Sequence, residues 1–123
     1  MSEFDANIPI YLQIMNTIKQ SIVSGSLKPG DRLASVRENA EKLSVNPNTI
    51  QRAYQELERE GVSETKRGMG SFIVEKEGLI SALRTEMAKS IMNTFIEGMR
   101  GLGFPDDAIT SALATELGGG KKL

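Results

Sequence analysis

Three side chains suited to hydrogen bonding with nucleic-acid bases lie close together along one predicted helix. Asn48, Arg52 and Gln55 are four and three residues apart, a spacing that places them on one face of an α-helix. Asparagine and glutamine can form two hydrogen bonds with adenine, and arginine can form two with guanine. Arg59 continues this face one turn later. The spacing therefore favours a helix whose outer face contacts DNA.

A basic pair, Lys66 and Arg67, stands beside two glycines, Gly68 and Gly70. Glycine allows a tight turn and a close approach to another backbone. Residues 62–74 therefore predict two short strands joined by a turn, with the two cations at its tip. Cations at this place are suited to DNA phosphates or to the minor groove.

Both patterns also have an ordinary structural interpretation. Arg52 and Arg59 could lie on a solvated helix face, where Glu56 is the i+4 partner of Arg52. Lys66 and Arg67 could form the tip of a hairpin that binds nothing. The residues alone leave these interpretations open.

Two capping signals place the base-binding candidates in a helix-turn-helix. Ser35 and Glu38 form the capping-box pattern, which starts a helix at Ser35. Asn46 followed by Pro47 starts another helix, because asparagine is a strong N-cap and proline is tolerated at the first helical position. Residues 44–46 form the tight turn between them. Two short helices joined in this way, the second polar on its outer face, make a helix-turn-helix.

Helical periodicity fills most of the remaining chain. Apolar residues spaced three and four apart predict helices over residues 8–25, from Leu79 to about residue 100, and around residues 109–117. The expected fold class is α+β and mainly α. It consists of three helices and a β-hairpin wing, followed by a two-helix C-terminal region.

The long predicted helix carries more apolar surface than two helices can bury between themselves. It could pack on its own chain, but the surplus favours a homodimer in which the same helices of two chains form a bundle. We expect a winged helix-turn-helix domain over residues 8–76 and a dimerisation region over residues 77–123. The residues expected at the dimer interface are Ile80, Leu83, Met87, Ile91 and Phe95.

The composition excludes several classes of protein. The 123 residues include no cysteine and no histidine, which removes disulfides, thiol nucleophiles, histidine-based triads and zinc sites. We therefore expect no enzyme, no cofactor and no metal site. Fifteen basic and sixteen acidic residues give a net charge of −1. This balance argues against a protein that coats nucleic acid through a uniformly basic surface. Residues 1–5 lack a signal-peptide pattern and no apolar run could span a membrane, so a cytoplasmic location is expected.

Four segments together resemble a known family. They are Pro9–Ile14, Leu27–Ala40, Asn46–Gly61 and the wing Lys66–Val74. Over residues 8–75 the chain is similar to the GntR-type winged helix-turn-helix regulators. The short C-terminal region and the Asn-Pro-Asn-Thr start of the third helix resemble the YtrA branch of that family, in which a two-helix appendage forms dimers.

The resemblance implies a set of DNA contacts. It assigns base reading to Arg37 on the second helix. For Arg52 we expect a mixed role, because Glu56 competes for its guanidinium group. A DNA contact by Ser35 is compatible with its capping role. The expected DNA-binding residues are Ser35, Arg37, Asn46, Asn48, Thr49, Arg52, Gln55, Lys66, Arg67, Gly68 and Gly70.

Two positions depart from the family pattern. Ala34 precedes the capping Ser35 where the family usually has proline, which should loosen the start of the second helix but leave its cap. Ser63 stands where the first wing strand usually carries an apolar residue, so we expect a weaker or more exposed strand.

The expected function is that of a sequence-specific, dimeric regulator of transcription, a repressor that occupies a two-fold operator in double-stranded DNA. The transcriptional role comes from the resemblance. A DNA-binding module without a regulatory role and a winged-helix protein-interaction module remain as alternatives. A small-molecule effector also remains open as a partner, although no polar constellation in the sequence identifies a ligand site.

Overall fold

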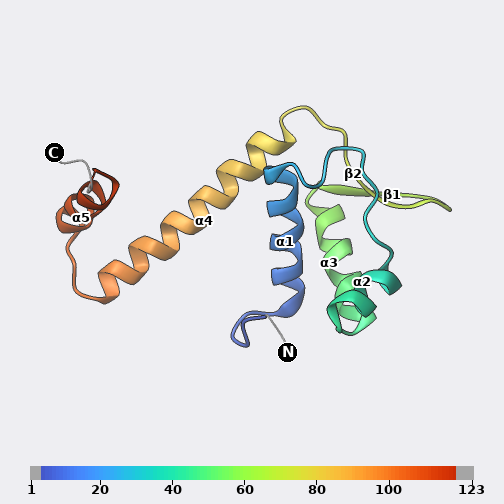
Figure 1. The fold of residues 1–123 in the computed structure, drawn as a ribbon, viewed down its shortest axis with the longest axis horizontal. Coiled ribbons are helices and arrows are strands. Elements are labelled where there is room, and N and C mark those ends of the chain that lie inside the picture. Colours follow the sequence, from blue (N-terminus) through green and yellow to red (C-terminus); the bar gives the residue numbers. More distant parts are fainter. Residues whose placement is uncertain (1–3, 119–123) are drawn as a thin grey trace. The chain divides into compact units, whose positions relative to one another are not determined.

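The computed structural model describes residues 4–118, which form five helices and one β-hairpin. This is the mainly helical α+β fold predicted above. Figure 1 shows the elements in chain order: α1 (Ile10–Ser24), α2 (Val36–Leu43), α3 (Pro47–Arg59), β1 (Ser63–Lys66), β2 (Gly70–Ile73), α4 (Leu79–Gly101) and α5 (Asp106–Gly118).

The chain divides into two compact units, one up to Leu83 and one from Arg84 onward. The first unit holds α1, α2, α3, the hairpin and the first turn of α4. The second holds the rest of α4 and α5. The division falls inside α4, because the first turn of that helix packs in the core of the first unit.

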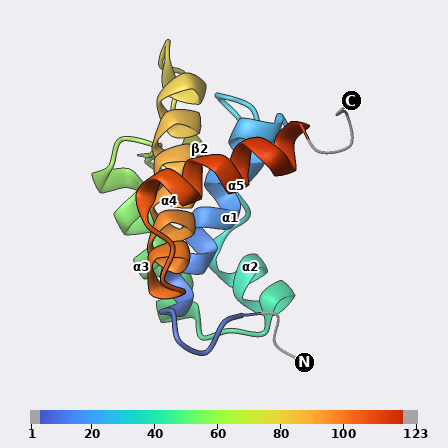
Figure 2. The same ribbon diagram turned by 90° about the vertical axis from the view of Figure 1, so that its left-hand side faces the viewer.

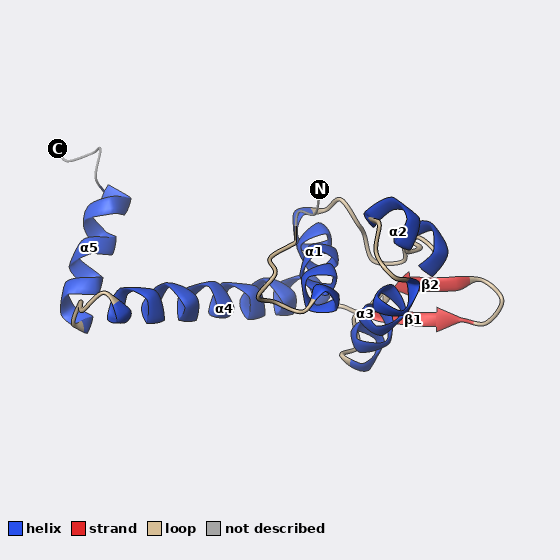
Figure 3. Cartoon of the chain, turned by 90° about the horizontal axis from the view of Figure 1, so that it is seen from below, coloured by secondary structure: helices blue, strands red, loops and turns tan. Residues whose placement is uncertain are grey.

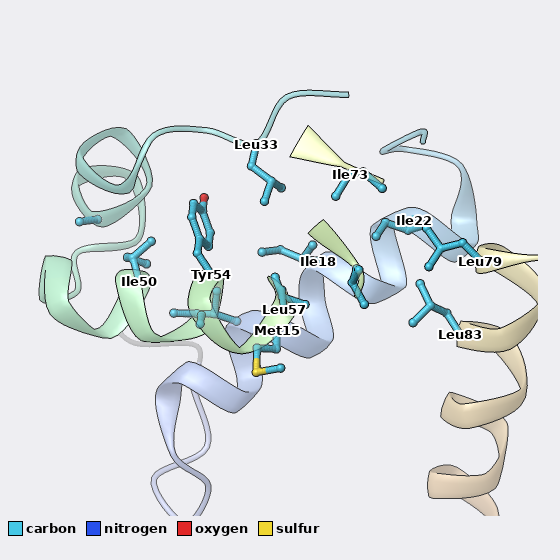
Figure 4. Packing of buried hydrophobic residues seen from close by; sticks show 14 residues of the cluster. Met15, Ile18, Ile22, Leu33, Ile50, Tyr54, Leu57, Ile73, Leu79 and Leu83 are labelled. Carbon is cyan, nitrogen blue, oxygen red and sulfur yellow. The ribbon is translucent and has the colours of Figure 1, made fainter. Parts of the chain in front are cut away.

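The core of the first unit lies between α1, α3 and the hairpin. Helix α1 packs along α3, and α2 packs against α3 as well (Figures 1 and 2). Leu79 and Leu83 point into the same cluster (Figure 4). The largest side chains that are completely buried are Ile22, Ile50, Leu57 and Ile73.

The capping box at the start of α2 is present as predicted. The Ser35 hydroxyl accepts a hydrogen bond from the Glu38 N–H at 3.0 Å, and the Glu38 carboxylate accepts one from the Ser35 N–H at 2.9 Å. Ala34 precedes this cap, where the family usually has proline. Its carbonyl accepts a 2.7 Å hydrogen bond from the Tyr54 hydroxyl, so α3 holds the residue that precedes the cap.

The two strands of the hairpin are antiparallel (Figure 3). Ser63 lies opposite Ile73, and Lys66 lies opposite Gly70. The other three residues of β1 are exposed, as expected for this strand, but Ser63 itself is only 3% exposed. The register explains the difference, because Ser63 is paired with the fully buried Ile73 and its small side chain fits at the edge of the core. Residues 30–33 lie along the other edge of β2, where the Leu33 N–H donates to the Ser71 carbonyl at 2.8 Å.

In the second unit, a bidentate ion pair joins the end of α4 to the start of α5. Arg100 donates from Nε and Nη2 to the two carboxylate oxygens of Asp106, at 2.9 and 2.8 Å. These hydrogen bonds lower the pKa of Asp106. Helix α5 turns away from α4 and does not fold back along it (Figure 3). Large apolar side chains of the second unit therefore stay exposed: Ile91, Met92, Phe95, Leu102, Phe104, Leu113 and Leu117.

Replacing Ser35 with alanine should lower the free energy of unfolding by about 1 kcal/mol, because the N–H of Glu38 loses its acceptor. Chemical denaturation at neutral pH measures the change. Ser90→Ala is the control, since Ser90 lies exposed on α4 and caps nothing. Equal stabilities of Ser35→Ala and the wild type would contradict the capping role.

Glu38 gives the cap a dependence on pH. The hydrogen bond from the Ser35 backbone lowers the pKa of Glu38 in the folded protein. The carboxylate therefore stabilises the fold at neutral pH, and this contribution disappears as the pH falls through the lowered value. The stability difference between the wild type and Glu38→Gln should shrink toward acid pH in urea titrations. A difference that stays constant with pH would show that the charge does not matter.

Candidate nucleic-acid interface

The outer face of α3 presents the predicted polar side chains. Ile50 and Leu57 on the opposite face are completely buried, which fixes the rotation of the helix. Asn48, Gln55 and Arg59 are exposed as a result. The face is therefore open to a ligand as wide as a DNA groove.

At the start of α3, the side chain of Asn46 caps the helix, while neighbouring polar side chains are exposed. The side-chain oxygen of Asn46 accepts a 2.8 Å hydrogen bond from the Asn48 N–H, so this oxygen is engaged inside the protein. Thr49 is half-buried. Gln51 is exposed and lies three residues after Asn48 and four before Gln55. The sequence prediction omits Gln51, because it lies at the margin of the polar arc. Its spacing to the other two amides is the signal that could have revealed it.

Arg37 is the second residue of α2, and its side chain is 89% exposed. Its only ion pair in the described part of the chain is with Glu41, at 3.9 Å and on the surface. Such an exposed ion pair contributes little to the stability of the fold. The guanidinium group is therefore available to a partner that approaches the start of α2.

Arg52 occupies a different environment from the one expected. Its guanidinium carbon lies 3.9 Å from the centroid of the Tyr11 ring, and its Nη2 donates to the Tyr11 hydroxyl at 3.3 Å. Glu56 pairs with Arg59 at 3.4 Å. The expected competition of Glu56 for Arg52 is therefore wrong, because α1 provides an aromatic ring on the other side of the arginine.

The wing carries its cations as predicted. Lys66 ends β1, with its Nζ 4.7 Å from the centroid of the Phe72 ring, and Arg67 is exposed in the turn. Gly68 and Gly70 have φ values of +76° and +116°, which glycine adopts without strain. The turn is closed by a 2.8 Å hydrogen bond from the Met69 N–H to the Lys66 carbonyl.

Arg32 attaches the wing turn to the segment that precedes α2. Its Nε donates to the Met69 carbonyl at 3.0 Å. A Cβ atom at Gly70 would lie 3.0 Å from the same Nε, so glycine also makes room for this contact. Sequence reasoning missed Arg32, since nothing local connects it to a turn 37 residues away.

The tyrosine at position 54 links α3 to α2. Its hydroxyl donates to the Ala34 carbonyl at 2.7 Å and accepts from the Asn39 side-chain amide at 3.0 Å. Burial raises the pKa of Tyr54. The residue is only 7% exposed, so its ring packs in the core.

Residues 4–118 hold neither a metal site nor a membrane-spanning helix. No group of three or more acidic side chains in this range is arranged to hold a metal ion. No helix within it is long and apolar enough to cross a membrane.

Comparisons with known proteins agree on one family. The pattern of the family described as "Bacterial regulatory proteins, gntR family" matches residues 10–73, just over half of the chain. The chain is 41% identical to the HTH-type transcriptional regulator YhcF of Bacillus subtilis, over 97% of this chain and 98% of YhcF. It is 40% identical to the HTH-type transcriptional repressor YtrA of the same organism, over 76% of this chain and 77% of YtrA.

A solved structure is similar over nearly the whole chain. It is a GntR family transcriptional regulator from Listeria monocytogenes, with a TM-score of 0.79 and 43% identity, covering 91% of this chain and 98% of that one. These regulators are DNA-binding proteins and not enzymes, in agreement with the expectation that this chain is no enzyme.

Replacing Lys66 and Arg67 together with alanine should weaken binding to all DNA sequences about equally. The slope of log affinity against log salt should fall by roughly one for each phosphate that the wing no longer neutralises. Fluorescence anisotropy on a labelled duplex at several salt concentrations measures this slope. A matched control is Lys76→Ala with Lys89→Ala, which removes the same charge from exposed positions outside the wing. A slope as steep as that of the wild type would mean that the wing does not contact DNA.

Proposed function

The chain belongs to the GntR family of bacterial regulatory proteins, and we propose that it acts as a dimeric repressor at a two-fold operator. It is a regulator of transcription with a DNA-binding helix-turn-helix. The proposal adds the residues that contact DNA, the oligomeric state and the sign of regulation. We also propose that it works in the cytoplasm and needs no cofactor.

The exposed polar face of α3 carries the proposal. In a helix-turn-helix, the second helix lies in the major groove with its first residues at the base edges. Asn48 and Gln55 are suited to adenine there, and Gln51 extends the same row of amides. Arg37 reaches the groove from the start of α2, and Lys66 and Arg67 on the wing contact phosphates. The domain boundaries proposed above, 8–76 and 77–123, assign these residues to the DNA-binding part.

The exposed apolar surface of the second unit supports a dimer. Ile91 is 69% exposed and Met92 is 55% exposed, although both lie within a 23-residue helix. Exposed apolar patches on soluble proteins mark interaction sites. Because a two-fold operator needs a two-fold protein, a second copy of the same helices is the partner that fits.

The position of Leu83 changes the expected interface. Leu83 is only 4% exposed and Ile80 is half-buried, and both pack with the core of their own chain. We therefore place the interface farther along α4, at Met87, Ile91 and Phe95 of the expected set, and extend it to α5.

The proposal that this chain represses transcription is based on the name of a related protein. YtrA is named a transcriptional repressor, and a dimer that covers an operator excludes polymerase without any further chemistry. We propose the same mechanism of occupancy for this chain.

Arg37 is proposed to read a base, and its alanine variant should show this. Removing a hydrogen-bonded pair with guanine should cost about 1–3 kcal/mol on the preferred operator and abolish discrimination at one position of each half-site. Affinities of the wild type and of Arg37→Ala for a panel of single-base operator variants test the role. If the variant ranks these operators as the wild type does, Arg37 is not a specificity residue.

The oligomeric state can be tested separately. Light scattering should give a mass of about 27 kDa, twice the 13.4 kDa of one chain, as expected for a two-fold dimer. Ile91→Glu with Phe95→Glu should give monomers, because two charges would be placed in an apolar interface. Ser90→Glu with Asn93→Glu adds the same charge on another side of α4 and should remain dimeric. A dimer that survives the first pair of substitutions would move the interface elsewhere.

A further inference from the structure

We propose that Tyr11 of α1 is a positioning residue for DNA binding, which holds Arg52 against a backbone phosphate and away from the base edges. The proposal rests on the proposed DNA-binding face and assigns different roles to two parts of it. Asn48, Gln51 and Gln55 would read bases, whereas Arg52 and Tyr11 would fix the position of α3 along the duplex.

The contact between Tyr11 and Arg52 constrains the arginine twice. The guanidinium group stacks on the ring at 3.9 Å and donates to the hydroxyl at 3.3 Å. The two residues are 41 positions apart in the sequence, so the contact also ties the start of α1 to the middle of α3. Tyr11 is half-buried and packs against the core, which gives Arg52 a rigid support.

The arrangement favours a phosphate over a base. A bidentate contact with guanine requires two N–H groups of the arginine, aligned in one plane with the base edge. Here one face of the guanidinium group is covered by the ring and Nη2 is engaged by the hydroxyl. The group is therefore turned toward α1, at the margin of the polar face. The remaining N–H groups can still meet a phosphate oxygen, which accepts donors from many directions.

The surrounding charges also favour an anion. Glu56, which could have neutralised Arg52, pairs with Arg59. The Tyr11 hydroxyl accepts from Arg52, and its own proton has no hydrogen-bond acceptor among residues 4–118. A phosphate at this point would receive donors from both side chains.

A double-mutant cycle tests the proposal. The proteins are the wild type, Tyr11→Leu, Arg52→Ala and the variant with both substitutions, and the ligands are the operator, its single-base variants and a random-sequence duplex. Arg52→Ala should weaken binding to all of them by about tenfold or more and lower the salt slope by about one. Tyr11→Leu should weaken binding about two- to fivefold, as expected when an exposed cation–π interaction is removed, and should have no further effect once Arg52 is alanine.

Two additional measurements separate positioning from folding. Tyr11→Phe keeps the ring and removes the hydroxyl, so its affinity should lie between those of the wild type and Tyr11→Leu. Thermal melting of each free protein identifies any variant that loses affinity by unfolding, and a loss of affinity that follows the loss of folded protein would overturn the proposal.

Three binding results would also overturn it. One is additive effects of the two substitutions, because Tyr11 would then act without Arg52. Another is Arg52→Ala losing discrimination at one base position, because Arg52 would then read a base. The third is a Tyr11→Leu protein that binds as the wild type does. A wild-type protein that binds no duplex at all would instead refute the proposed function.

Discussion

The arrangement of the helices in the DNA-binding unit depends on the hydrogen bonds of the Tyr54 hydroxyl group. This group comes from the buried side of α3, donates to the Ala34 carbonyl before α2 and accepts from Asn39 within α2. One buried group thus sets the position of α2 relative to α3. Burial raises the pKa of Tyr54 further above neutral pH, and the protonated hydroxyl is a donor. An unpaired Tyr54 hydroxyl would be costly in this buried place, so the two helices are held in one arrangement.

The same segment before α2 also positions the wing. Residues 30–33 pair with β2, and Arg32 reaches the Met69 carbonyl in the turn. The hairpin is therefore fixed to the residues that lead into the cap at Ser35. A surface made of α2, α3 and the wing can recognise DNA as one body only if these parts do not move independently, and the short contacts around residues 30–35 provide this.

The sequence predicted what is local and missed what is distant. The caps at Ser35 and Asn46 depend on residues within three positions, and the structure contains both. The surroundings of Arg52 depend on Tyr11, 41 positions earlier, and no local sequence pattern connects the two residues. The apolar spacing of α4 predicted a helix, but it did not show which apolar residues would be buried. Leu83 packs in the core of the first unit, whereas Ile91 is exposed, because only the first turn of α4 lies against the other helices of that unit.

A two-fold dimer of this chain that reads bases with α3 and α2 should select its own operator. Enrichment of bound duplexes from a random pool, using the full chain, is therefore the decisive experiment. We expect an enriched inverted repeat whose half-site centres lie about 10 bp, or a multiple of that, apart. Fixed bases should occur within each half-site. A protein that binds the pool but enriches no sequence, or enriches a single half-site without a symmetric partner, would contradict base reading by a two-fold dimer.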